Sequence, residues 1–105
     1  MYAKNKFIKT LQLLGCYDVR LCSHTDYLGR RYYSGFITKP DTGLTVYLSA
    51  ESFYNPHCDN KFLVRYAKEI GDYRGGVNRY TAPENSPFMV HTLLSSPNLY
   101  KRELS

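Results

Sequence analysis

The residues that could bind a metal ion or act as a nucleophile lie in two short segments. Cys22 and His24 form a Cys-x-His pair, and His57 and Cys58 are adjacent. Four such ligands could in principle bind Zn²⁺ tetrahedrally. However, neither pair has the spacing that lets two ligands grip one ion from a single turn, and adjacent residues of an extended segment point to opposite sides. We therefore predict that the protein binds no metal and no cofactor.

His57, Cys58 and Asp59 superficially resemble a catalytic triad because they follow one another in the sequence. Catalytic triads, however, are assembled in space by a fold and not by sequence neighbours. The chain also lacks a Gly-x-Ser-x-Gly motif, a P-loop and a dinucleotide-binding fingerprint. We predict that the protein is not an enzyme. A small enzyme or metal protein is the least favoured alternative.

The remaining chemistry is recognition by arginine and tyrosine. Arginine offers planar, bidentate donors to phosphate or carboxylate, and tyrosine offers a stackable ring with a polar tip. Proteins that grip single-stranded nucleic acid interleave the two types, but both are also enriched at protein–protein hot spots. The composition therefore leaves both partners open. The candidate contact residues are Arg30, Arg31, Tyr32, Lys61, Arg65, Lys68, Tyr73, Arg74, Arg79 and Tyr80.

Several of these candidates lie in the stretch GDYRGGVNRYTAPENSP, residues 71–87, whose glycines and prolines predict an irregular loop. One hypothesis makes it a connector that packs Tyr73 and Val77 on the core and turns the chain. The other makes it a contact loop, because glycine beside arginine lets the backbone approach a partner and long loops usually have a use.

The totals favour an acidic partner. Lysine and arginine outnumber aspartate and glutamate by 14 to 9, which gives a net charge of +5 and excludes an acidic mimic of DNA. Eleven tyrosines and five phenylalanines in 105 residues exceed what one small core needs, so several tyrosines must be exposed. No run approaches the ~18 apolar residues of a transmembrane helix, and three cysteines do not suit a secreted disulfide scaffold. We expect a cytoplasmic protein that does not contact a membrane.

The first half of the chain predicts the elements that position these residues. Apolar side chains spaced by three and four predict a helix over residues 3–14, with Phe7, Leu11 and Leu14 on its buried face. Alternation then predicts three strands, over residues 17–22, 30–38 and 44–49, that form an antiparallel meander. Gly35 suggests a bulge or close packing, and Gly43 suits a turn that needs a positive φ.

The second half predicts another helix over residues 61–70, with Lys61, Arg65 and Lys68 on its outer face as a solvated or phosphate-contacting stripe. A fourth strand is predicted over residues 87–96, with a short helix as the alternative, and residues 97–105 read as a polar tail. The fold class is thus a single α+β domain, residues 1–105. Its first 70 residues resemble double-stranded-RNA-binding domains in element order, but the lysine cluster expected at the second helix is replaced by CDNKFLVR. No activity follows from the order alone.

We predict a non-enzymatic binding protein that engages nucleic acid or a nucleoprotein through a surface rich in tyrosine and arginine. The alternative is a phage or mobile-element inhibitor that blocks a host defence nuclease by protein–protein contact, in the manner of anti-CRISPR proteins. Such an inhibitor would target a host protein, and its basic face would occupy a phosphate channel or cover an acidic patch beside it. The charge and the absence of catalytic motifs fit both hypotheses.

Overall fold

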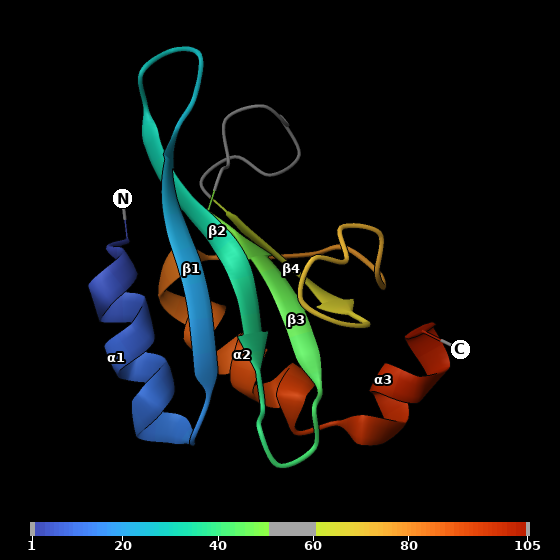
Figure 1. Ribbon diagram of the computed structural model, residues 1–105. Coiled ribbons are helices and arrows are strands. Elements are labelled where there is room, and N and C mark those ends of the chain that lie inside the picture. The colour runs from blue at the N-terminus through green and yellow to red at the C-terminus, as the bar shows by residue number, and fades with distance from the viewer. Residues whose placement is uncertain (1, 51–60, 105) are drawn as a thin grey trace.

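In the described part of the chain, strands that follow one another in the sequence are also neighbours in the sheet. The computed structural model describes residues 2–50 and 61–104, and within them one antiparallel sheet has the order β1-β2-β3-β4-β5 (Figure 1). The helices and strands up to β5 are α1 (Lys4–Leu14), β1 (Asp18–Thr25), β2 (Arg31–Thr38), β3 (Thr45–Ser49), β4 (Phe62–Ala67) and β5 (Arg79–Thr81). The rest are the 3₁₀ helix η2 (Pro83–Asn85), α2 (Ser86–Leu94) and α3 (Pro97–Leu104). The α+β fold class is confirmed.

The amphipathic helix and the first three strands form where predicted, with two differences. β1 continues three residues beyond the predicted end, to Thr25, and Leu14, predicted on the buried face of the helix, is only partly buried. Phe7 and Leu11 of α1 are fully buried, and in β3 Val46 and Leu48 are buried whereas Tyr47 is not. Gly43 has φ +76° in the turn between β2 and β3, as expected. A Cβ on Gly35 would lie 1.9 Å from the backbone oxygen of Arg20, so the close approach of β1 and β2 requires glycine there.

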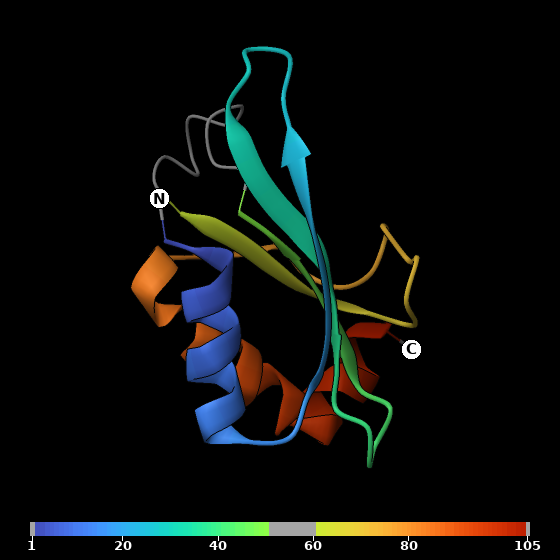
Figure 2. The ribbon, with the colours of Figure 1, turned by 60° about the vertical axis from the view of Figure 1, so that its left-hand side comes forward.

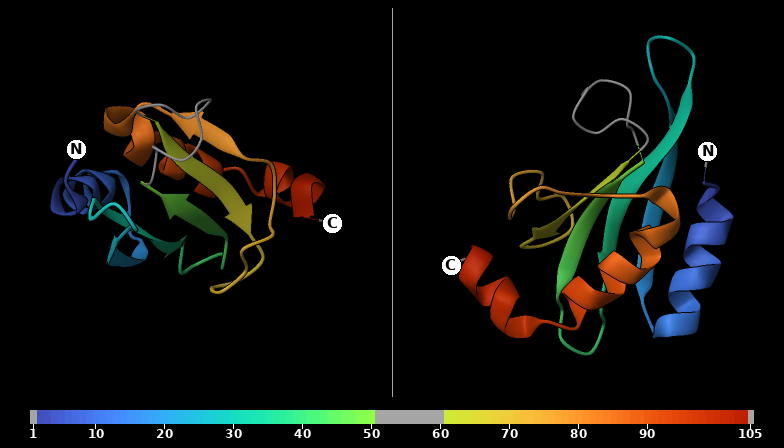
Figure 3. Two further views of the ribbon diagram at one scale, coloured as in Figure 1. Left: turned by 90° about the horizontal axis from the view of Figure 1, so that it is seen from above. Right: turned by 180° about the vertical axis from the view of Figure 1, so that it is seen from behind.

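All the helices of the described residues lie against the same face of the sheet, as the side and rear views show (Figures 2 and 3). The core forms between α1, α2 and this face, and its centre includes Ile37, Leu48, Val64 and Tyr66. The hairpin of β1 and β2 extends past the other strands at one end (Figure 2). The opposite face of the sheet carries no helix among the described residues, and we call it the open face.

The second predicted helix, residues 61–70, is wrong: the segment forms strand β4 in the sheet. Phe62 and Tyr66 are four residues apart, a spacing that fits a helix face and also fits every second position of a strand. The burial of Val64 between them, with Leu63 and Arg65 less buried, is the alternation of a strand. The expected helical stripe of three cations therefore does not form.

The strand predicted over residues 87–96 is also wrong, because helix α2 occupies the segment. Pro87 stands in its first turn, where the missing N–H costs nothing, and Pro87, Val90 and Leu94 are buried at spacings of three and four. The predicted polar tail is helix α3, whose Leu99 and Leu104 pack against the core. The predicted loop 71–87 is interrupted by β5 and η2.

The element order thus departs from that of double-stranded-RNA-binding domains where those domains need their second helix. The sheet instead continues through β4 into β5. His57, Cys58 and Asp59, considered from the sequence as possible metal ligands or catalytic residues and not favoured, lie outside the described residues.

Candidate nucleic-acid interface on the open sheet face

The open face is built by the alternate side chains that do not enter the core. Residues directly opposite in an antiparallel pair share a face, and the register pairs Phe36 with Arg20 on one side and with Tyr47 on the other. Tyr47 is in turn opposite Arg65 on β4. The side chains that the register places on this face include Arg20, Cys22, His24, Tyr32, Ser34, Phe36, Tyr47, Leu63, Arg65 and Tyr80.

Three rings form an aromatic cluster at the centre of this face: Phe36, Tyr47 and Tyr73. Their centroids lie 5.4 Å apart for Phe36–Tyr47, 5.4 Å for Phe36–Tyr73 and 5.6 Å for Tyr47–Tyr73, and Tyr73 meets the other two edge-on. Such edge-to-face contacts are favourable arrangements of aromatic rings. Phe36 is only 5% exposed, whereas Tyr73 is 63% exposed. The cluster therefore has a buried base and one ring open to a partner.

Arg65 joins this cluster to the segment that follows β4. Its guanidinium carbon lies 4.8 Å from the centroid of the Tyr47 ring, a cation–π distance. The same guanidinium donates hydrogen bonds to the backbone oxygen of Tyr73 and, at 3.4 Å, to Oδ1 of Asn78. Among the described residues, its buried Nε has no hydrogen-bond partner. Arg65 thus holds the segment 68–78, which we call the clamp loop, against the open face.

Asp72 fixes the local shape of the clamp loop. Its carboxylate accepts the backbone N–H of Lys68 and the backbone N–H of Arg74, each at 2.9 Å. These two hydrogen bonds lower the pKa of Asp72, because they favour its charged form. A Cβ on Gly75 would lie 2.0 Å from the backbone oxygen of Tyr66. The close approach of the loop to β4 therefore requires glycine at position 75. The loop is therefore built to lie on the sheet.

The clamp loop does not pack as the connector hypothesis required. Tyr73 is 63% exposed and Val77 is 58% exposed, so neither is buried in the core. Arg74 is exposed beside them. The prediction that this segment contacts a partner is compatible with this arrangement and stays a prediction.

A second pair of rings lies on the open face towards the tip of the β1–β2 hairpin. His24 and Tyr32 are direct partners in the register, and their ring centroids are 5.0 Å apart with planes inclined by 30°. At the other edge of the sheet, Tyr80 of β5 is half-buried opposite Leu63. Aromatic side chains therefore occur along the open face from its first strand pair to its last.

The side chain of Arg79 lies on the opposite face of the sheet from those of Arg65 and Tyr80. It lies on β5 opposite the buried Val64, turned towards the helices, where it forms a bidentate ion pair with Glu103 of α3. The side chains of Arg79 and Glu103 are 24% and 10% exposed. Hydrogen bonding to this partner raises the pKa of Arg79 and lowers that of Glu103. Arg79 thus fastens α3 to the sheet.

The structure brings only part of the predicted set together. Tyr32, Arg65, Tyr73 and Tyr80 share the open face or lie on it. Arg30 and Arg31 are at the hairpin, and Lys61 and Lys68 flank β4 as exposed residues. The sequence prediction missed Phe36, Arg20, His24 and Tyr47 as members of one surface.

Among residues 2–50 and 61–104, no three histidine, cysteine, aspartate or glutamate side chains gather into a group that could hold a metal ion. Cys16 and Cys22 are exposed free thiols. None of the helices in these ranges is long and apolar enough to cross a membrane.

Comparisons with protein-family models, with curated proteins and with solved structures found no match to this chain.

Proposed function

We propose that the protein binds single-stranded nucleic acid on the open face of its sheet. The observation that carries this proposal is the aromatic cluster of Phe36, Tyr47 and Tyr73, crossed by the guanidinium of Arg65 on a face that no described helix covers. A base can stack on an exposed ring mounted on a sheet, and each such stack contributes roughly 1–3 kcal/mol. Tyr73 offers the most exposed ring of the cluster.

Charge near this face supports the same partner. Arg74 in the clamp loop and Lys61 before β4 are both exposed, and Arg20 lies on the open face itself. Arg20 forms an ion pair with the exposed Asp18, with 3.1 Å between Nε and Oδ2. Such surface ion pairs are weak, so a phosphate can compete with Asp18 for Arg20. The net charge of +5 adds a favourable long-range field for a polyanion.

Single strands fit this surface better than duplexes do. Stacking on Tyr73, or on the His24–Tyr32 pair, needs unpaired bases whose faces are free. Base pairs in a duplex hide those faces. The proposal therefore includes a preference for single-stranded DNA or RNA over double-stranded forms of the same sequence.

The test is fluorescence anisotropy of labelled single-stranded and double-stranded DNA and RNA at several salt concentrations. We expect tighter binding of the single strands, with log K falling against log salt by roughly 0.7 for each phosphate neutralised. Arg74→Ala should reduce this slope by about one such step. The matched control is Arg102→Ala, which removes an exposed arginine from α3.

The same surface could instead cover a protein partner, as in the inhibitor hypothesis. Buried tyrosine-centred contacts depend far less on salt than phosphate contacts do. No binding of any nucleic acid at low salt would exclude the proposed function. A search for a protein partner of the open face would then follow.

A further inference from the structure

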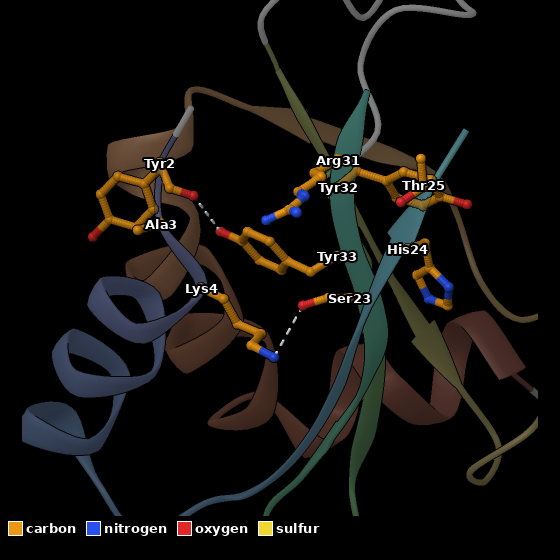
Figure 4. Close-up of a pocket in the computed structure, with 9 residues that line it drawn as sticks. All are labelled: Tyr2, Ala3, Lys4, Ser23, His24, Thr25, Arg31, Tyr32 and Tyr33. Carbon is orange, nitrogen blue, oxygen red and sulfur yellow. Dashed lines mark hydrogen bonds between the residues drawn. The ribbon is translucent and has the colours of Figure 1, made fainter. Parts of the chain in front are cut away.

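A cavity of about 560 Å³ lies between the start of α1 and the β1–β2 hairpin (Figure 4). Two hydrogen bonds bridge its walls. The hydroxyl of Tyr33 donates to the backbone oxygen of Tyr2 at 2.8 Å, and Nζ of Lys4 donates to Oγ of Ser23 at 3.2 Å. Burial raises the pKa of Tyr33, so its hydroxyl remains a donor throughout the physiological range. Two hydrogen-bond donors, the Tyr33 hydroxyl and the Lys4 amino group, thus connect the two walls of the cavity.

Two basic side chains, those of Lys4 and Arg31, enter this cavity, and no described lining residue is an aspartate or glutamate that could pair with them. Figure 4 shows Lys4 and Arg31 directed into the space between α1 and the hairpin, from opposite walls. Within residues 2–50 and 61–104, neither cation forms an ion pair. Lys4 uses one of its donors on the neutral Ser23 hydroxyl. An arrangement of this kind favours a compact anion, and the planar fork of arginine suits the oxygens of a phosphate.

The cavity borders the open face through the hairpin itself. His24 and Tyr32 contribute to its wall, while their stacked rings lie on the open face, on the other side of the strands from Tyr33 (Figure 4). β1 is the edge strand of the described sheet, so His24 lies on the edge strand and Tyr32 on the strand next to it. The backbone of a nucleotide whose base stacks on Tyr32 would therefore have to pass around one edge strand to reach the cavity on the helix side of the hairpin.

We propose that this cavity binds the terminal phosphate of a single strand held on the open face, with Lys4 and Arg31 as its phosphate ligands. The inference rests on the proposed function, because it needs a strand on that face. A free mononucleotide or inorganic phosphate carries the same chemistry, so the experiment separates these sources.

The experiment compares single-stranded oligothymidines of equal length that carry a 5′-phosphate, a 3′-phosphate or hydroxyls at both ends, with the fluorophore placed internally. We expect one phosphorylated form to bind about tenfold more tightly than the hydroxyl form, a difference of ~1.4 kcal/mol. Lys4→Ala and Arg31→Gln should each remove this preference, measured within each variant as the ratio of the dissociation constants for the hydroxyl strand and the phosphorylated strand. Lys9→Ala removes an exposed lysine of the same helix away from the cavity and should keep the preference. Circular dichroism checks that every variant is folded.

Equal affinity for all three oligothymidines would overturn the cavity proposal and leave the proposed function intact. A preference that survives in both Lys4→Ala and Arg31→Gln would also overturn it, because the phosphate would then bind elsewhere. Thymidine monophosphate and inorganic phosphate, added as competitors, identify the source. If a strand does not bind but thymidine monophosphate does, as measured by calorimetry, the strand-end assignment and the proposed function both fail.

Discussion

Arg65 and Arg79 lie on neighbouring strands but point to opposite faces of the sheet, and this difference separates their roles. Arg65 crosses the Tyr47 ring and holds the clamp loop on the open face. Arg79 points to the helices and pairs with Glu103. Both were predicted as contacts from residue type alone. Only the register of β4 and β5 shows which of them a partner can reach.

We predict that Glu103→Gln lowers stability without affecting nucleic-acid binding. Losing a charged hydrogen-bonded pair that is mostly buried should reduce the free energy of unfolding by roughly 1–3 kcal/mol at neutral pH. Arg79 lowers the pKa of Glu103, so the carboxylate stabilises the fold above the ordinary glutamate pKa of about 4.3. That contribution disappears as pH falls through the lowered pKa of Glu103.

Urea unfolding of both proteins across pH measures this effect. The difference between Glu103→Gln and the native protein should be full at neutral pH and shrink in acid. Glu69→Gln, at an exposed glutamate after β4, is the control and should change stability little. A constant difference at every pH would show that the ionised pair is not the cause.

At the same scale, Tyr73→Ala should weaken single-strand binding by about tenfold, because one stacking platform is lost. Its ring is mostly exposed, so stability should change much less than affinity. Tyr27→Ala removes another tyrosine, 78% exposed at the hairpin turn, and serves as the matched control. Anisotropy titration measures both. Equal losses in the two variants would argue against a specific role for the aromatic cluster.

At the scale of elements, the sequence of segment 61–67 does not decide between a helix and the strand β4 that forms. Phe62 and Tyr66 fit a helix and a strand equally, and the choice depends on whether a partner strand is available. β3 provides that partner on one side and β5 on the other. By contrast, α1 and the first three strands have periodicities that fit only one element, and these were predicted correctly. The open face could be inferred only in part, since two of its five described strands, β4 and β5, were not predicted.

The clamp loop carries its own prediction. Asp72→Ala removes the acceptor for two backbone N–H groups, which should loosen the loop and reduce single-strand affinity through misplacement of Tyr73. Because hydrogen bonding lowers the pKa of Asp72, the ordered loop is favoured above the usual aspartate pKa and is lost as pH falls through the lowered value. Amide hydrogen exchange of residues 68–78 reports the change. The loop should exchange faster in the variant at neutral pH, whereas unchanged exchange would disprove the role of Asp72.

At the scale of the whole molecule, all helices lie on one side of a five-stranded sheet within the described residues. This one-sided arrangement leaves aromatic residues on the other side. The composition predicted exposed tyrosines, because eleven tyrosines are more than this core needs, and the net charge of +5 predicted a basic surface. It could not foretell which tyrosines share a face, since that depends on contacts between distant segments, such as Arg79 with Glu103.

The most direct test of the open-face proposal is an NMR titration that follows the ring signals of tyrosines as a single-stranded oligonucleotide is added. We expect the ring signals of Tyr32, Tyr47, Tyr73 and Tyr80 to shift, because a stacked base changes the magnetic environment of these rings. Tyr17 and Tyr66, which are buried in the core away from the open face, are the internal controls, and their ring signals should not shift. Saturable shifts confined to the open-face rings would support the proposed function. Shifts centred on the helices, or none at low salt, would contradict it.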